Sequence, residues 1–240
     1  MELQGRLNEA FASLTDSLVT EFDVAELLTR VAEYCVSLCS AGGAGIVVLD
    51  TNGALRDVAY SSDAVRRLET FQTHVGEGPC VDCVRSGRRV VSSDLAADTA
   101  RWPVFAPEAV RAGFASVRAL PLRLGTSTVG ALNLFDLTVG DASDEDLRRA
   151  QTLADIAVIA LLQQGVAGAP WHAKQSVSRT LQARSVIERA KGVLAEHGSL
   201  DMDEAYSRLR RYAATSGDSL TDIAERLVDG QLAVRRILAG

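Results

Sequence analysis

Residues 181–228 contain three amphipathic segments, which read LQARSVIERAKGVLAEH (181–197), MDEAYSRLRRYAAT (202–215) and LTDIAERLV (220–228). Apolar residues recur at intervals of three and four in these segments, a pattern that predicts three helices packed on one another. Arginine and lysine are concentrated in the first two segments. A compact three-helix module can bury its apolar stripe and still present these cations to a polyanion such as RNA.

Charge is distributed unevenly along the 240 residues. The part from Trp171 onward holds 11 of the 25 Lys and Arg and 9 of the 31 Asp and Glu, a net charge of +2, which leaves −8 for the first 170 residues. A polyanionic partner is therefore expected at the C-terminal part. No apolar run approaches the roughly 18 residues that cross a bilayer, and MELQGRLNEA does not resemble a signal peptide. We expect a cytoplasmic protein without a membrane partner.

The first 165 residues follow a different pattern, in which helical and β periodicities alternate. Asp23 and Glu26 form a capping-box-like start for one helix, and Ser143 is expected to cap a long one. Turn residues at 51–53 and 125–126 predict two hairpins. The expected helices are 7–18, 24–38, 63–73, 81–86, 108–112 and 147–164, and the expected strands are 45–50, 54–61, 88–92, 116–124 and 127–137. This order predicts an α+β domain, with an antiparallel sheet flanked by helices.

The sequence GVAGAP (165–170) interrupts both patterns with two glycines and a proline, as a linker does. We therefore expect an N-terminal domain at 1–165, a linker at 166–176 and an all-α three-helix domain at 177–240.

Four cysteines lie in the first 90 residues, at Cys35, Cys39, Cys80 and Cys83. Cys80 and Cys83 form a CxxC pair, which is compatible with a redox pair or half of a zinc site. Their spacing from the other two falls outside the usual zinc patterns, and buried, reduced thiols are the favoured interpretation. A thiol redox sensor or thiol enzyme that uses Cys80 and Cys83 stays open as the alternative. No catalytic, metal or cofactor motif is predicted elsewhere.

A tight turn is expected at 76–80 and an irregular loop at 94–107. Trp102 and Phe105 in this loop can close over the open face of the sheet, so a small-ligand pocket is expected between the loop and the turn that holds Glu77. The simpler alternative is that both rings pack over the core as a lid.

The C-terminal segments resemble an ANTAR domain, the three-helix RNA-binding module of bacterial transcription antiterminators. The matching residues are Arg184, Ile187, Glu188, Ala190-Lys191-Gly192, Glu204-Ala205-Tyr206, Leu209-Arg210, Leu220, Asp222-Ile223-Ala224 and Val228. The chain departs from the family at Ala195 and Ala214, where methionine is common, and at the loop 216–219, which lacks basic residues. The candidate RNA-binding residues are Arg184, Glu188, Lys191, Gly192, Arg208, Arg210 and Arg211.

The N-terminal part resembles a GAF domain of the actinobacterial kind found fused to ANTAR. The motifs that carry this resemblance are 76–80 (GEGPC), 101–103 (RWP), 119–122 (ALPL) and 130–134 (GALNL). GAF domains are sensory, are often dimeric and bind varied small molecules. The candidate ligand pocket accordingly comprises Glu77, Cys80, Trp102, Phe105 and Asn133.

Together the two resemblances imply a one-component, non-enzymatic regulator that binds paired RNA hairpins and prevents a terminator from forming. Loop bases are unstacked and readable, and arginine can both contact phosphate and stack on bases. Two hairpins require two modules, so we expect a parallel homodimer that pairs helices 7–18 and 147–164 across a two-fold axis. DNA binding is disfavoured because the third helix begins Ser219-Leu220-Thr221-Asp222, without a base-reading cation.

Overall fold

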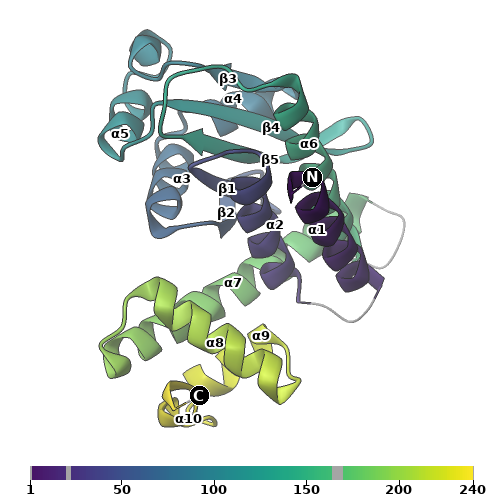
Figure 1. Ribbon diagram of the computed structural model, residues 1–240, viewed down its shortest axis with the longest axis vertical. Coiled ribbons are helices and arrows are strands. Elements are labelled where there is room, and N and C mark those ends of the chain that lie inside the picture. The colour runs from purple at the N-terminus through teal and green to yellow at the C-terminus, as the bar shows by residue number, and fades with distance from the viewer. Residues whose placement is uncertain (1, 20–22, 164–169, 240) are drawn as a thin grey trace.

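The computed structural model describes residues 2–19, 23–163 and 170–239. It contains a sheet domain, formed by α1 to α6, and a helical module, formed by α7 to α10 (Figure 1). The sheet domain consists of α1 (Glu2–Val19), α2 (Val24–Leu38), β1 (Gly43–Leu49), β2 (Leu55–Tyr60), α3 (Asp63–Val75), α4 (Pro79–Ser86), β3 (Val90–Ser92), the 3-10 helix η1 (Ala97–Ala100), α5 (Phe105–Arg111), β4 (Ser116–Leu124), β5 (Ser127–Asp136) and α6 (Asp144–Gln163). The helical module consists of α7 (Pro170–Gly198), α8 (Met202–Ser216), α9 (Leu220–Val228) and α10 (Val234–Leu238).

The strands of the described residues form one antiparallel sheet in the order β2-β1-β5-β4-β3. In the central pair, Ile46 of β1 lies opposite Leu132 of β5. Glycine is needed at position 130, because a Cβ there would lie 2.2 Å from the carbonyl oxygen of Val47 on the neighbouring strand. The predicted α+β class with a helix-flanked antiparallel sheet is confirmed.

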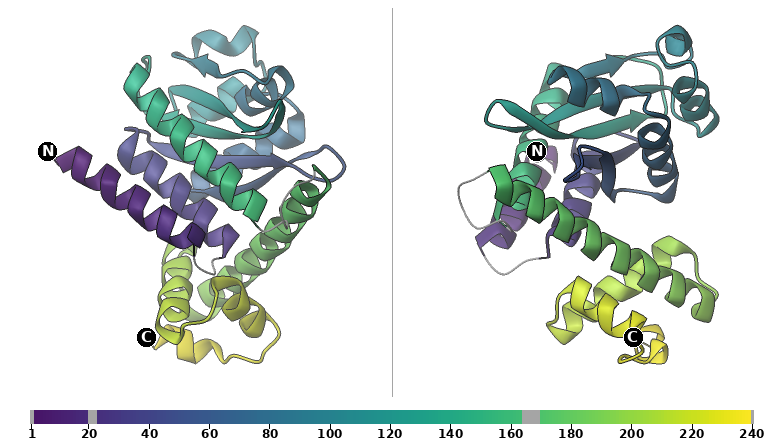
Figure 2. Two further views of the ribbon diagram at one scale, coloured as in Figure 1. Left: turned by 90° about the vertical axis from the view of Figure 1, so that its right-hand side faces the viewer. Right: turned by 180° about the vertical axis from the view of Figure 1, so that it is seen from behind.

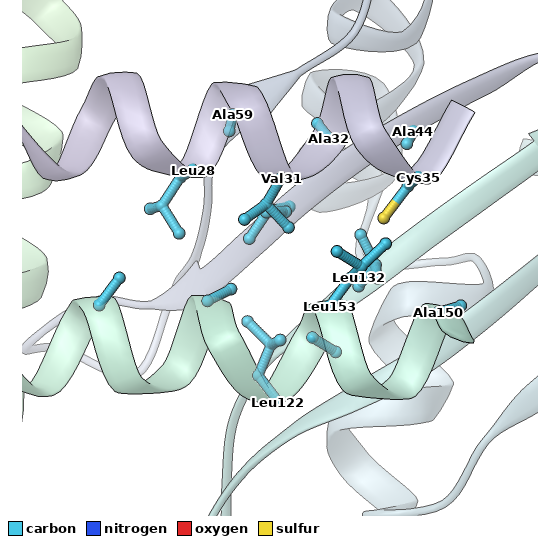
Figure 3. Close-up of a cluster of buried hydrophobic side chains, with 14 of the residues drawn as sticks. Leu28, Val31, Ala32, Cys35, Ala44, Ala59, Leu122, Leu132, Ala150 and Leu153 are labelled. Carbon is cyan, nitrogen blue, oxygen red and sulfur yellow. The ribbon is translucent and has the colours of Figure 1, made fainter. Parts of the chain in front are cut away.

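One face of the sheet is covered by α1, α2 and α6, which run side by side across it (Figure 2, left). Figure 3 shows the centre of this layer, where Leu28 and Val31 of α2 lie in one cluster with Leu153 of α6 and Leu132 of the sheet. All four side chains are buried. Each apolar side chain of this size contributes about 1.5–3 kcal/mol when it leaves water, so this layer is a main source of the domain's stability.

The other face of the sheet is covered by α3, α4, α5 and the segment that contains Trp102 and Phe105. The two rings are fully buried and meet edge to face, with centroids 6.0 Å apart. The Trp102 Nε1–H donates to Asp82 on α4 at 3.1 Å. This face is therefore closed by aromatic packing.

Several boundaries differ from the sequence expectations. The proposed tight turn at 76–80 already contains the first residues of α4, because Pro79 occupies the first helical position and Gly78, at φ 136°, is its N-cap. A proline tolerates the first helical position, where its missing N–H would have had no partner. The loop expected at 94–107 contains η1 and the start of α5, which begins at Phe105.

The first helix of the helical module begins earlier than its amphipathic pattern indicates. Residues 170–176, which the glycine and proline pattern assigns to a linker, form the start of α7, with Pro170 at its first position. Residues 164–169, which include the last residue of the expected helix 147–164 and the rest of the expected linker, lie outside the described part of the chain. The short helix α10 has no counterpart among the expected elements.

Helix α7 contributes apolar residues to both parts of the molecule. Ile187 and Leu194 are buried in the core of the helical module, whereas Leu181 packs against the sheet-domain core. Conversely, the sheet domain contributes Ala25 of α2 to the core of the helical module. The helical module is therefore docked against α2 and β2 of the sheet domain (Figure 2, right).

Candidate nucleic-acid interface

Arg184 and Lys191 lie two turns apart on α7, and both contact the ring of Tyr60 at the end of β2. The Arg184 guanidinium carbon is 3.9 Å from the ring centroid, and the Lys191 ammonium is 5.3 Å from it. The Lys191 Nζ also donates to the Tyr60 hydroxyl at 3.4 Å. Arg184 is 6% exposed and Lys191 2% exposed. These two candidate RNA-binding cations are thus buried where the sheet domain meets the helical module.

Glu188 lies between the two cations on the same helix. Its Oε1 is 3.1 Å from Nη2 of Arg184 and 3.3 Å from Nζ of Lys191. Burial lowers the pKa of Lys191, and Glu188 acts against that shift by stabilising the ammonium form. Glu188 therefore helps to hold two cations at a buried surface.

Arg210 on α8 is held by two carboxylates of α2. Its Nε lies 3.3 Å from Glu26, and its Nη1 lies 3.2 Å from Glu33. Burial raises the pKa of Glu26, and the Arg210 charge opposes this shift. A third predicted RNA-binding cation is therefore also engaged by the sheet domain.

The remaining candidate residues lie elsewhere. Arg208 donates to Glu204 at 2.8 Å and to the Leu238 carbonyl at 3.1 Å, so it fastens α10 to α8. Arg211 is exposed. Gly192 is half-buried, and among the described residues nothing lies within 4 Å of the place where a Cβ would be, so packing does not require a glycine there.

Asp23 joins the two parts through its two carboxylate oxygens. Oδ1 accepts from the N–H of Ala25 at 2.9 Å and caps α2, as its capping pattern predicts. Oδ2 accepts from the N–H of Thr221 at 2.8 Å and from the Thr221 hydroxyl, at the first turn of α9. The start of α9, which carries partial positive charge, is therefore neutralised by a sheet-domain carboxylate.

The sequence pattern did not identify Tyr60, Glu26, Glu33 or Asp23 as contacts of the helical module. Each has an ordinary local role as a strand end, a helix surface residue or a cap. Their common location becomes evident only when the helical module is docked, and a single sequence carries no signal for that docking.

The residues of the candidate ligand pocket take part in caps, core packing and a buried polar cluster. Glu77 Oε1 accepts from the N–H groups of Val104 at 2.7 Å and Phe105 at 2.8 Å, so this carboxylate caps the start of α5. Trp102 and Phe105 pack in the core. This is the arrangement expected if the two rings form a lid over the core instead of lining a pocket. In the part of the chain that the structure describes, these residues line neither of two cavities, one of about 270 Å³ between the two parts and one of about 500 Å³ beside β2, α3 and α4.

Asn133 and Cys80 belong to a buried polar cluster beneath α3. Asn133 Nδ2 donates to both Glu69 oxygens, at 2.8 and 3.0 Å, and Gln72 donates to the same carboxylate. The Cys80 N–H donates to the Gln72 Oε1 at 3.3 Å. Burial raises the pKa of Glu69 to about 8, and the hydrogen bonds from Asn133 and Gln72 oppose this shift. The cluster is satisfied mainly by its own members.

All four cysteines are buried and unpaired. Burial raises the pKa of Cys83 to about 12 and that of Cys39 to about 11, and it raises those of Cys35 and Cys80 well above the usual range. A protonated, inaccessible thiol is a poor nucleophile and a poor metal ligand. This geometry does not favour the thiol alternative, and within residues 2–19, 23–163 and 170–239 no cluster of three or more His, Cys, Asp or Glu could hold a metal ion.

A single antiparallel sheet between two helical layers, followed by a docked helical module, defines a two-part protein with an α+β domain and an all-α domain. The chain belongs to the GAF domain family, which matches residues 22–162, and an ANTAR domain matches residues 175–228. Both are regulatory domains. Below, residues 2–163 are called the GAF domain and residues 170–239 the ANTAR domain.

Solved structures support the fold of the GAF domain. The GAF domain of an Acinetobacter phosphoenolpyruvate-protein phosphotransferase has a TM-score of 0.52 at 10% identity, over 68% of this chain and 96% of its own. The corresponding domain from Coxiella burnetii has a TM-score of 0.51 at 13% identity, over 66% and 94%. Free methionine-R-sulfoxide reductase from Neisseria meningitidis has a TM-score of 0.50 at 16% identity, over 71% and 91%. Identities this low establish the fold alone.

No curated protein matches the chain. Among the described helices, none has the length and apolar character required to cross a membrane.

Proposed function

We propose that the chain is a signal-responsive, non-enzymatic regulator that binds hairpin RNA of transcript leaders through its ANTAR domain and promotes transcription antitermination. The GAF domain controls this binding by covering the RNA-binding face. The observation that carries the proposal is the burial of Arg184 and Lys191 against Tyr60. Burying incompletely paired cations at a domain boundary costs free energy of folding. An open state in which these cations bind a polyanion would explain why they are present.

The covering surface has the chemistry of the proposed RNA ligand. The Tyr60 ring accepts the flat guanidinium of Arg184 as an unstacked loop base would. The carboxylates of Glu26 and Glu33 pair with Arg210 as phosphates would, and Asp23 occupies the start of α9. Because Tyr60, Glu26 and Glu33 use the same cations that RNA would use, the docked arrangement and RNA binding exclude each other.

The described arrangement is therefore the closed state of a two-state regulator. A signal that loosens the contact between the two domains exposes Arg184, Lys191 and Arg210, and RNA then stabilises the open state by mass action. The equilibrium responds only to ligands that bind one state better than the other. The GAF domain sets the fraction of open molecules.

Paired hairpins require two ANTAR domains, and we propose a parallel homodimer in the cell's cytoplasm. Helices α1 and α6 are the elements that would pair, and each carries an exposed apolar residue, Leu3 on α1 and Ile159 on α6. Sedimentation equilibrium of the full chain tests this point. A dimer that Ile159→Glu converts to a monomer supports the arrangement, and a wild-type monomer at all concentrations contradicts it.

The proposed function is tested by crosslinking the protein to RNA in its host and sequencing the bound RNA. We expect transcript leaders with two adjacent hairpins to be enriched, and purified protein to increase read-through of the corresponding terminators in transcription reactions. Lys191→Met is the matched variant, because it removes one charge at nearly constant side-chain length. Recovery of RNA without structured leaders, or read-through that Lys191→Met leaves unchanged, contradicts the proposal.

A further inference from the structure

A cavity of about 270 Å³ lies between the GAF and ANTAR domains and is lined by residues of both. Tyr60, Ser61 and Ser62, which all carry hydroxyl groups, line it from the GAF domain. Arg184 and Lys191 of α7 and Ser207 of α8 line it from the ANTAR domain. Its volume is close to the lower end of ligand pockets, about 300 Å³, so it fits a small metabolite.

The cations that line this cavity are incompletely satisfied. The Nε of Arg184 is buried and has no hydrogen-bond partner among the described residues. The three hydrogen bonds of the Lys191 ammonium, to Tyr60 and to the two oxygens of Glu188, measure 3.3 to 3.4 Å. Distances above about 3.2 Å are long for N–H···O bonds. Two almost fully buried cations thus share one carboxylate, and their hydrogen bonding is incomplete.

The other charged groups near the cavity are paired elsewhere or exposed to water. Glu33 also lines it, but its carboxylate is paired with Arg210. Asp203 lines it from the start of α8 and is exposed to water, where its charge is screened. The Arg66 guanidinium, which pairs with Asp63, lies 5.9 Å from the Tyr60 ring.

The N-terminus of α3 adds an electrostatic field that favours an anion in the cavity. Ser62 lines the cavity and is the N-cap of this 13-residue helix, where its Oγ accepts from the N–H of Val65. The N-terminus of a helix carries partial positive charge and favours an anion nearby. Two cations, hydroxyl-bearing residues and this helix start therefore border one partly open cavity.

We propose that this cavity binds a small oxyanion, the carboxylate or phosphate group of a metabolite, and that the bound anion holds the two domains closed. The anion contacts both domains at once, so it binds the closed state and is lost when the domains separate. By linkage, it lowers the affinity for RNA. This regulatory role rests on the proposed RNA-binding function, whereas binding of the anion does not.

The first test follows thermal unfolding of the full-length chain without RNA. Inorganic phosphate is titrated against sodium chloride at matched ionic strength, and succinate in a parallel series supplies a carboxylate of metabolite size. We expect at least one oxyanion to raise the unfolding midpoint above that of the chloride series, along a saturable curve. A shift with phosphate indicates that the ligand carries a phosphate group, and a shift with succinate indicates a carboxylate. Midpoints that follow ionic strength alone in both series overturn the proposal.

A matched pair of variants places the effect in the cavity. Ser62→Asp adds a carboxylate beside the cations, and Ser62→Asn adds a neutral group of the same shape. Asp and Asn cap a helix about as well as Ser, so α3 keeps its cap in both. The saturable shift should disappear in Ser62→Asp and persist in Ser62→Asn. A shift of equal size in both variants and the wild type overturns the assignment of the site.

RNA binding is then measured with and without the saturating oxyanion. Weaker RNA binding with the anion supports the proposed regulation, and unchanged RNA binding overturns it. A saturable shift in a protein that binds no RNA under any condition supports the cavity while contradicting the proposed function. RNA binding by a protein whose unfolding midpoint responds to neither oxyanion supports the proposed function while contradicting the anion site. The two failures are therefore distinguishable.

Discussion

The guanidinium carbon of Arg184 lies 3.9 Å from the centre of the Tyr60 ring, so one GAF-domain side chain covers the planar face of an ANTAR-domain cation. Stacking of this kind contributes about 0.5–2 kcal/mol, more when the pair is removed from water. This stacking, the ion pairs of Arg210 and the hydrogen bonds of Asp23 are the specific contacts that hold the ANTAR domain against the GAF domain.

Replacement of Tyr60 by leucine is expected to increase RNA affinity. Leucine keeps an apolar side chain in this mostly buried position and removes both the ring and the hydroxyl that Arg184 and Lys191 use. A loss of about 1–2 kcal/mol from the closed state corresponds to roughly a five- to thirtyfold gain in the open fraction. Titration of a fluorescent hairpin RNA measures the gain. Tyr34→Leu, on α2 and half-buried, is the control and should leave the affinity unchanged.

Lys191→Met is expected to weaken RNA binding without unfolding the protein. Methionine fits a buried position without the cost of desolvating a charge, so the unfolding midpoint should stay the same or rise. Loss of one phosphate contact should lower the slope of log affinity against log salt by about 0.7–0.9. Arg56→Met, at an exposed GAF-domain ion pair, should leave this slope unchanged. An unaltered slope in Lys191→Met would remove this residue from the RNA-binding face.

Glu77 is expected to act as a structural cap. Glu77→Ala leaves the N–H groups of Val104 and Phe105 without their acceptor and should reduce the free energy of unfolding by about 1 kcal/mol. Glu77→Gln retains an acceptor oxygen and should lose less. Urea denaturation of both variants measures the difference. Equal stability of Glu77→Ala and the wild type would show that the cap is unimportant.

The stability of the GAF domain is expected to fall as the pH rises from about 4.5 toward 8. In the folded state burial holds the pKa of Glu69 near 8, whereas its ordinary value is 4.5, so the native protein keeps a proton that the unfolded chain releases. The stability that this proton confers is fully present below the ordinary value and is lost as the pH passes the folded value. Glu69→Gln should remove this dependence and unfold at higher urea than the wild type near pH 8. Parallel pH profiles would contradict the assignment.

Local signals in the sequence predict part of the fold accurately. The bounds of α2 follow from the Asp23 cap and a regular apolar period, and β4 ends at Leu124 before the glycine turn. The start of α5 cannot be found in this way, since its cap Glu77 lies 27 residues before Val104. The start of α7 was missed because its first residues resemble a linker, although Pro170 is compatible with a helix start.

The candidate site also has one part that local sequence patterns predict and one part that they do not. The identity of Arg184, Lys191 and Arg210 as a cationic group can be predicted from helix periodicity and family resemblance. Their burial against Tyr60 and Glu33 depends on how two parts of the chain dock, and no spacing within either part encodes that contact. The same limit explains why the cavity between the domains was not expected.

The central claim is that the GAF domain holds the ANTAR cations away from RNA. Its most direct test is the dissociation constant for a hairpin RNA of the double variant Glu26→Gln, Glu33→Gln, which frees Arg210 from both carboxylates. The control is Glu108→Gln, Glu145→Gln, which makes the same change of charge at two ion pairs on α5 and α6. We predict that the first double variant binds RNA at least several-fold more tightly than both the wild type and the control. Equal affinities in all three proteins, or weaker binding by the first variant, would contradict the claim.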